Sequence, residues 1–288
     1  MRTIPFAHPV SHVRLLAEAG GWRCPNTGEV FPIVNGAPVF IPYRLQNHME
    51  GERMGLLNSC KTFLRRFPFF YITLIYIISP ICFVGRSAAS FVREFRKDAL
   101  LLNIGSGIHT FGPNVLNLDI FWYKGVDVVG DAMALPFATD SIDGAVCECL
   151  IEHVPDPQAV IHEIVRVLKP NGRAYIAAPF VYPFHACPND FFRWSIEGAK
   201  ILCKRAGAEI EIVAPRSGPT SALVAELGVW AAIVCSFGNN TLFSVLNIFF
   251  TTLFSPLKWI DVVFGRYKTA IHGPGSWYAV IRKPDTRG

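Results

Sequence analysis

Charge is scarce in this chain. Only 17% of its 288 residues are Asp, Glu, Lys or Arg, whereas 51% are hydrophobic and the mean hydropathy is +0.33. This balance is unusual for a protein that is surrounded by water on all sides, so we expect part of its apolar surface to meet lipid or a partner. The net charge of +5 suits an anionic membrane surface. The basic residues form no stripe interleaved with aromatic residues, which argues against nucleic-acid binding.

The chain also lacks cysteine pairs and an export signal. Its eight cysteines contain no C-x-x-C pattern, and only Cys147 and Cys149 lie close together. We therefore expect buried, reduced thiols rather than disulfides. The beginning, MRTIPFAHPVSHVRLL, has neither the long apolar core nor the small-residue cleavage site of a signal peptide. We therefore expect the functional part to face the cytoplasm.

Long apolar runs do occur, at two places. Residues 67–84 read FPFFYITLIYIISPICFV without a charge. This run only just reaches membrane-spanning length, and its prolines shorten any helix. Residues 219–264 divide at Gly238-Asn239-Asn240 into two apolar arms, which predicts a helical hairpin. We expect this hairpin to lie in the membrane surface. Alternatives are full spanning, or a cap that packs against protein.

The region 101–179 alternates between strand-like and helix-like segments. It reads LLNIGSG, NLDIF, GDAMALPF, SIDGAVCECLIEHV and VLKPNGRAYIAAP, and the later phrase WYAVIR at 277–282 predicts one more strand. This alternation predicts an α/β fold with a parallel sheet, whose ligand lies at the carboxyl ends of the strands. The apolar hairpin is then an insertion before the last strand, and its two ends lie on the same side.

A glycine loop follows the first strand of this region. Gly105, Ser106 and Gly107 let the backbone approach a ligand without an intervening Cβ. Asp119 ends the second strand, where a carboxylate can accept both hydroxyls of a ribose. The loop and the acid together predict a nucleotide-like ligand.

The next acid extends this site. Asp131 is placed to accept a hydrogen bond from an adenine amino group, with Ala132 and Met133 beside the ring. A dinucleotide-binding site is the rival prediction, but position 110 is a threonine, so the pattern G-x-G-x-x-G is not completed.

As a set, these motifs resemble class I S-adenosylmethionine-dependent methyltransferases. They match the subgroup with LPF after the adenine-binding acid and an LEH-like phrase, here LIEH at 150–153, after the fourth strand. The resemblance covers roughly residues 99–215 and the last strand. It implies a Rossmann-like seven-stranded sheet and S-adenosyl-L-methionine as the cofactor, with no metal.

The resemblance also assigns two further cofactor contacts and shows two departures. Asn103 stands where the family usually has an acid, and Glu148 ends the fourth strand. Asn103 brings no charge to the methionine amino group. The segment between Gly107 and Asp119 is short and contains Gly112-Pro113, so we expect the first crossover helix to be short or absent.

Candidate catalytic residues follow the fourth and fifth strands. His153 begins the segment after the fourth strand, where packing under the cofactor is an equal alternative to catalysis. The phrase PFHACPNDFFRWS contains His185, Asp190 and Arg193 and leads to a helix capped by Ser195. His185 with a nearby carboxylate can act as a general base. Arg193 can hold an anionic acceptor, or it can pair with Asp190 to fold the loop.

Residues 1–50 contain Asn35-Gly36 between two short apolar runs, which predicts a β-hairpin. The segment resembles half of a zinc-ribbon module that accompanies some methyltransferases, although Cys24 is its only cysteine. The predicted domains are 1–50, a helical segment over 51–98 with an apolar anchor, and the methyltransferase domain over 99–288.

The sequence thus predicts a methyltransferase on the cytoplasmic face of a membrane, in keeping with its resemblance to bacterial methyltransferases of surface-glycan and lipid pathways. Its predicted acceptor is lipid-linked or amphipathic, with oxygen as the methylated atom. Two alternatives remain open, a quinone-type C- or O-methyltransferase and a degenerate, non-catalytic membrane scaffold. The oligomeric state is left open.

Overall fold

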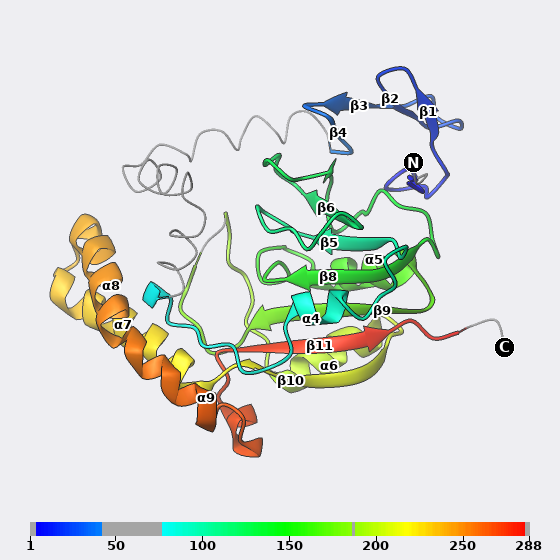
Figure 1. The fold of residues 1–288 in the computed structure, drawn as a ribbon. Helices are drawn as coiled ribbons and strands as arrows, with labels where there is room; N and C mark the ends of the chain where they lie inside the picture. The colour runs from blue at the N-terminus through cyan, green and yellow to red at the C-terminus, as the bar shows by residue number, and fades with distance from the viewer. Residues whose placement is uncertain (1–3, 42–76, 186–187, 286–288) are drawn as a thin grey trace.

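The computed structural model describes residues 4–41, 77–185 and 188–285. Its centre is a seven-stranded sheet in the order β10-β11-β9-β8-β5-β6-β7 (Figure 1). The strands are β5 (Leu101–Ile104), β6 (Val115–Asp119), β7 (Val128–Val129), β8 (Ile142–Glu148), β9 (Leu168–Pro179), β10 (Glu209–Ser217) and β11 (Ser276–Arg282). Six of them run parallel, and β11 is antiparallel to its neighbours β9 and β10. The predicted α/β sheet is confirmed.

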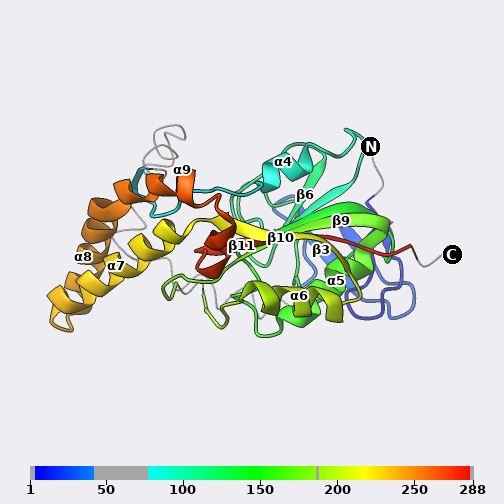
Figure 2. The same ribbon diagram turned by 90° about the horizontal axis from the view of Figure 1, so that it is seen from below.

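Helices cover both faces of this sheet. The helices α5 (Pro157–Val167) and α6 (Ile196–Arg205) lie on one face, and the short α4 (Ala88–Val92) lies on the other (Figure 2). The start of α5 is set by Asp156, whose carboxylate accepts a hydrogen bond from the Ala159 amide. Ser195 caps α6 in the same way, as its position in the sequence predicts. Between β5 and β6 the described chain forms turns only, so the first crossover helix is absent, as expected.

A small antiparallel sheet precedes the large one. Its strands are β1 (Leu16–Glu18), β2 (Gly21–Arg23), β3 (Val30–Val34) and β4 (Ala37–Pro38). The predicted hairpin is confirmed, because Val34 pairs with Ala37 across a two-residue turn. Both turn residues, Asn35 and Gly36, have positive φ values of 51° and 83°, as a type I′ turn requires.

The small sheet closes one edge of the large one. The Phe40 amide donates to the Val129 carbonyl oxygen on β7 at 2.8 Å, and Phe6 stacks on Phe137 with ring centroids 5.5 Å apart. The zinc-ribbon resemblance is not confirmed: Cys24 is buried and is the only cysteine within residues 4–41.

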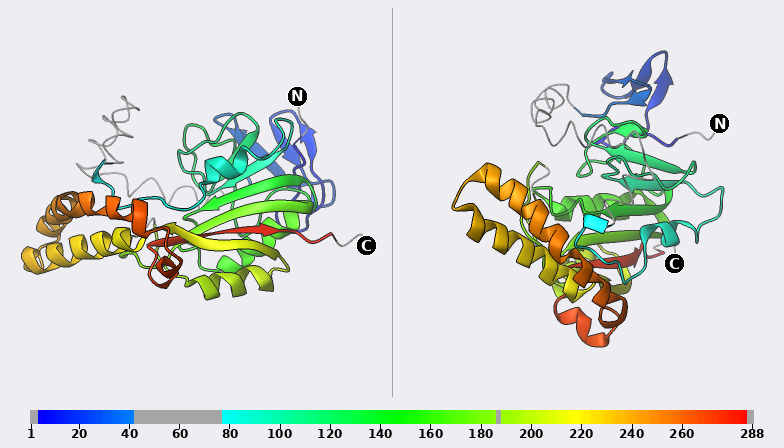
Figure 3. Two further views of the ribbon diagram at one scale, coloured as in Figure 1. Left: turned by 60° about the horizontal axis from the view of Figure 1, so that its bottom comes forward. Right: turned by 60° about the vertical axis from the view of Figure 1, so that its left-hand side comes forward.

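The apolar insertion forms the predicted helical hairpin. It comprises α7 (Pro219–Ser236), α8 (Asn240–Phe254), η2 (Ser255–Ile260), α9 (Asp261–Phe264) and η3 (Lys268–His272). The turn uses Phe237 and Gly238 in the left-handed region. A Cβ on Gly228 would lie 2.6 Å from the Thr251 hydroxyl, so this glycine lets the two long helices approach closely. The hairpin extends well beyond the sheet (Figure 3).

Apolar side chains remain exposed along this hairpin. Those at least half exposed on α7 and α8 are Leu223, Trp230, Ile233, Val234, Val245, Phe249 and Leu253. Pro219–Ser236 and Asn240–Phe264 are long and apolar enough to cross a membrane, with mean hydropathies of 1.4 and 1.3. Core helices of water-soluble proteins can be equally long and apolar, so length and composition alone are weak grounds for a membrane segment. The apolar run at 67–84 lies largely outside the described residues, as does much of the predicted segment 51–98.

Candidate active site

A cavity of about 350 Å³ opens where the parallel strands end. This volume falls within the range of about 300–1,000 Å³ that is typical of small-molecule sites. Most of its lining is apolar and comes from the loops after β5, β6, β7 and β8. The lining residues are Gly105, Gly107, Leu118, Asp119, Ile120, Phe121, Tyr123, Gly130, Asp131, Ala132, Met133, Cys149, Leu150, His153, Val154, Pro155, Pro188 and Asn189.

The glycine loop and Asp119 form one wall of the cavity. Gly105 and Gly107 have φ values of 69° and 52°, which is the left-handed region that favours glycine. The two Asp119 carboxylate oxygens accept hydrogen bonds from the amides of Gly107 at 2.8 Å and of Phe121 at 2.9 Å. Each oxygen keeps a lone pair for a ligand hydroxyl. Burial raises the pKa of Asp119 above its ordinary value.

Asp131, Ala132 and Met133 form the neighbouring wall. The Asp131 carboxylate accepts a hydrogen bond from the Met133 amide at 2.8 Å, which fixes the turn after β7. Ala132 is buried and Met133 half-buried. The structure therefore brings the two predicted acids and the two predicted apolar neighbours to the same cavity.

Three other predicted cofactor contacts lie outside this lining. The Asn103 side chain donates to the His109 carbonyl oxygen at 3.0 Å and to the Asn117 side chain at 3.1 Å. Glu148 accepts a hydrogen bond from Arg216 at 2.6 Å. Ser106 is buried, and its hydroxyl has no partner among the described residues. Asn103 and Glu148 thus already form hydrogen bonds with neighbouring elements of the protein.

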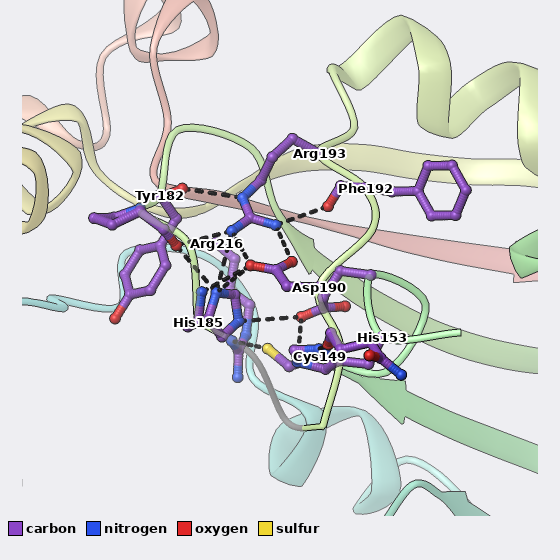
Figure 4. A network of polar contacts seen from close by, with 11 residues as sticks. Cys149, His153, Tyr182, His185, Asp190, Phe192, Arg193 and Arg216 are labelled. Atoms are coloured by element: carbon purple, nitrogen blue, oxygen red, sulfur yellow. Dashed lines mark hydrogen bonds and ion pairs between the residues drawn. The ribbon is translucent and has the colours of Figure 1, made fainter. Parts of the chain in front are cut away.

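Arg193 organises the loop after β9 (Figure 4). All five of its N–H groups have acceptors: both oxygens of Asp190 and the carbonyls of Tyr182, Pro183 and Phe192. No donor is left for an acceptor phosphate, so the prediction that Arg193 holds an anion is replaced by its alternative, an ion pair that folds the loop. Asp190 also accepts from the His185 backbone amide at 2.8 Å. Both residues therefore position His185.

The loop places His185 beside His153 and Glu152. The two imidazole rings meet edge to face, with centroids 5.0 Å apart. Burial lowers the pKa of His185, which keeps the imidazole neutral near pH 7. Glu152 is fully buried, and desolvation raises its pKa to about 7. Neither of its oxygens has a hydrogen-bond partner among the described residues.

Glu152 was not predicted from the sequence as a site residue. Neither were Cys149, Leu150 and Asn189, which line the cavity. The signal for Glu152 was present, because it directly precedes His153 in the LIEH phrase. No pattern in the sequence indicated that Asn189 belongs to the site. Its carbonyl oxygen contacts the His153 ring at 2.5 Å only because the loop after β9 folds back over β8.

Part of the chain that forms this edge also matches a family of known proteins. Residues 112–176 match a family of methyltransferase domains. This part of the chain is therefore similar to methyltransferase domains. The predicted resemblance to class I S-adenosylmethionine-dependent methyltransferases is thereby confirmed, and the domain and its fold indicate S-adenosylmethionine as the cofactor.

Curated relatives of the methyltransferase domain align over short stretches. The chain is 40% identical over 70 residues to the ubiquinone/menaquinone biosynthesis C-methyltransferase UbiE of Cereibacter sphaeroides, which is 24% of this chain and 26% of that protein. It is 52% identical over 56 residues to the chloroplastic 2-methyl-6-phytyl-1,4-hydroquinone methyltransferase of Arabidopsis thaliana, or 19% of this chain and 16% of that protein. The chain thus spans about a quarter or less of these relatives' lengths.

A solved structure similar to this chain is phosphoethanolamine N-methyltransferase 2 of Haemonchus contortus, in complex with phosphomonomethylethanolamine and S-adenosylhomocysteine. It shares 17% identity with a TM-score of 0.47, over 78% of this chain and 60% of that one.

The cavity of the methyltransferase domain fits its cofactor. Gly105 has a positive φ of 69°, and a Cβ there would lie 2.9 Å from the Leu150 side chain, so glycine is favoured at this turn. Asp119 offers free lone pairs for the ribose, Asp131 lies on the next loop for the adenine, and apolar side chains line the space between. When bound, S-adenosylmethionine supplies a methyl group on a sulfonium. The glycine loop, Asp119 and Asp131 would hold it.

Proposed function

We propose that this protein is an S-adenosylmethionine-dependent methyltransferase that works at a membrane surface and methylates an oxygen of a lipid-linked or amphipathic acceptor. We place it on the cytoplasmic face, with the membrane surface and the acceptor as its partners. Methyl transfer is supported by the domain match and by the cavity. Membrane contact and the class of acceptor are supported by a different feature, the apolar hairpin.

The observation that carries this argument is the position of the apolar hairpin. Because β10 is parallel to β9, α7 leaves the sheet at the same edge at which β9 ends. Ser217, the last residue of β10, pairs with Ser276, which in turn pairs with Pro179 at the end of β9. That edge also carries the cavity. An apolar surface beside the cavity mouth would hold a lipid-bearing acceptor close to the cofactor.

The loop after β9 supplies the groups that prepare an acceptor. A hydroxyl must lose its proton as it attacks a sulfonium methyl, and a neutral imidazole near the cavity can take it. His185 is neutral because its burial lowers its pKa, and Asp190 with Arg193 holds its loop in place. His153 lines the cavity itself. We assign proton transfer to this pair of histidines.

A second candidate function is methylation of a ring carbon in a prenylated quinol. The names of two relatives favour it, since one is a ubiquinone/menaquinone C-methyltransferase and the other a phytyl-hydroquinone methyltransferase. Such acceptors are also amphipathic, so the same hairpin would serve them. They differ in the product, a C–CH₃ bond instead of an O–CH₃ bond.

The test is methyl transfer from isotope-labelled S-adenosylmethionine to a bacterial membrane lipid extract, with the full chain in mild detergent. We expect a labelled lipid product that is absent with Asp119→Ala. Base hydrolysis releases the label from a methyl ester, and tandem mass spectrometry separates an O-methyl ether from a methylated ring carbon. A protein that binds S-adenosylmethionine but labels neither class would contradict the proposal and favour the non-catalytic scaffold.

A further inference from the structure

We propose that Glu152, His153 and His185 bind a divalent transition-metal cation at the edge of the cofactor cavity. Two imidazole nitrogens and one carboxylate form a set of ligands suited to Zn²⁺, Fe²⁺ or Co²⁺. Such a site is independent of whether the protein transfers methyl groups.

The three ligand atoms converge on one point. The His153 Nε2 lies 3.8 Å from the Glu152 Oε1, and the His185 Nε2 lies 3.9 Å from the same oxygen. All three groups have a ligand atom within 4.8 Å of the others. Two atoms bound about 2.0–2.2 Å from one ion in tetrahedral geometry lie about 3.3–3.6 Å apart, a few tenths of an ångström less than these separations. Small side-chain rotations would therefore close the set around an ion.

The hydrogen bonds of both histidines point their free lone pairs at this spot. The His153 Nδ1 contacts the Asn189 carbonyl oxygen at 2.5 Å, and the His185 Nδ1 contacts the Pro183 carbonyl oxygen at 3.1 Å. A carbonyl oxygen only accepts, so each Nδ1 carries the proton and each neutral Nε2 is an acceptor. Metal-binding histidines have this arrangement, in which a backbone carbonyl orients the ring.

A nearby arginine does not change this assignment. The Arg193 Nη2 lies 3.2 Å from the His185 Nδ1. Its two protons already go to the Pro183 carbonyl at 2.8 Å and to Asp190 at 2.7 Å. The longer contact therefore leaves the Nδ1–H of His185 directed at the Pro183 carbonyl.

Glu152 is the second, independent sign of a ligand. Its side chain is fully buried, and neither oxygen has a hydrogen-bond partner among the described residues. A buried carboxylate without a partner is costly, and here it faces two nitrogen lone pairs as well. A cation between the three groups would satisfy all of them at once.

The site lies where it can act on an acceptor. His153 lines the cavity, so open coordination positions of the ion would face the cofactor side. An acceptor hydroxyl bound there would have a lowered pKa and would lose its proton to solvent more easily. This consequence rests on the proposed function. With the ion bound, the Nε2 atoms of His153 and His185 are both ligands, and the ion replaces the two imidazoles as the source of acceptor acidity.

The experiment uses the full chain in mild detergent, stripped with EDTA and titrated with Co²⁺, whose visible absorption reports nitrogen and oxygen coordination. We expect one Co²⁺ per chain, displaced by Zn²⁺. Glu152→Gln and His185→Ala should each weaken binding by at least about tenfold, whereas His162→Ala, at an exposed histidine on α5, should bind as the unaltered protein does. Circular dichroism checks that each variant folds.

Two results would overturn the inference: no one-to-one absorption change on titration, or equal Co²⁺ binding by Glu152→Gln and the unaltered protein. Its failure is distinguishable from failure of the proposed function. Full methyl transfer in EDTA without Co²⁺ binding would reject the metal site alone. Co²⁺ binding that depends on Glu152, without methyl transfer to any lipid, would support the metal site and reject only the proposed function.

Discussion

At the scale of single residues, Asp119 carries the clearest expectation. Its carboxylate holds the glycine loop through the Gly107 amide and keeps free lone pairs toward the cavity. Asp119→Ala should weaken S-adenosylmethionine binding by about 1.5–3 kcal/mol for each charge-assisted hydrogen bond that is lost. Isothermal titration calorimetry measures this. Asp98→Ala, at an exposed acid paired with Arg96, is the matched control, and equal affinities for both variants would remove Asp119 from the site.

The same residue predicts a pH dependence. Burial raises the pKa of Asp119 above the ordinary value of 3.8, and only the ionised carboxylate accepts two ribose hydroxyls. S-adenosylmethionine affinity should therefore fall as the pH falls through this raised pKa. The loss should begin at a higher pH than it would for an exposed aspartate. Calorimetry from neutral pH down toward the ordinary aspartate pKa of 3.8 follows the loss. Asp119→Asn should bind weakly with a flat profile over this range, so a parallel decline in that variant would point to another group.

Some site residues could be predicted from the sequence, and others could not. The glycine loop, Asp119 and Asp131 were predicted because each lies at the end of a strand or just after it, and the backbone alone determines where they lie. For Arg193 the sequence left two partners open, an anionic acceptor or Asp190, and for Glu148 it predicted a contact with the cofactor. Their real partners, Asp190 with three carbonyls for the first and Arg216 for the second, include groups that only the folded chain brings close.

At the scale of elements, the base of the hairpin depends on one buried acid. Asp261 on α9 accepts hydrogen bonds from the amides of Thr220 and Ser221 and from the Ser221 hydroxyl, and so caps α7 from a distance. Gly218 is required beside it, since a Cβ there would lie 2.2 Å from the carboxyl carbon of Asp261.

Asp261→Ala leaves these buried donors without an acceptor, so we expect a loss of about 1–3 kcal/mol in the free energy of unfolding for each. We also expect faster protease cleavage at the start of α7. Urea unfolding and limited proteolysis measure the two effects. Asn239→Ala removes the exposed cap of α8 at the hairpin tip and should cost only about 1 kcal/mol. A larger loss at the tip than at the base would contradict this account.

At the scale of the whole molecule, the hairpin and the cavity share one edge of the sheet, so the proposed membrane contact should be linked to turnover. Val245 and Phe249 are 60% and 55% exposed on α8. Val245→Glu combined with Phe249→Glu removes two apolar side chains that are each worth about 1.5–3 kcal/mol when buried in lipid. Vesicle flotation should show at least about tenfold weaker binding.

Turnover on a long-chain acceptor in vesicles should fall with this binding, while S-adenosylmethionine affinity stays unchanged. Ile201→Glu is the control, because Ile201 is 53% exposed on α6, away from the hairpin. If the double variant floated with vesicles as well as this control does, the hairpin would not be the membrane contact.

The sequence by itself determined the elements and their order. Alternating apolar segments specified the sheet, Asn35-Gly36 specified a turn through backbone preference, and apolar arms around Gly238 specified a hairpin. These features depend on near neighbours in the chain. Only the tertiary structure decided that the hairpin leaves the sheet at the same edge as the cavity, and that Glu152 on one loop faces His185 on another. Such contacts join residues far apart in sequence, and their geometry follows from how the strands are ordered and how the loops pack over them.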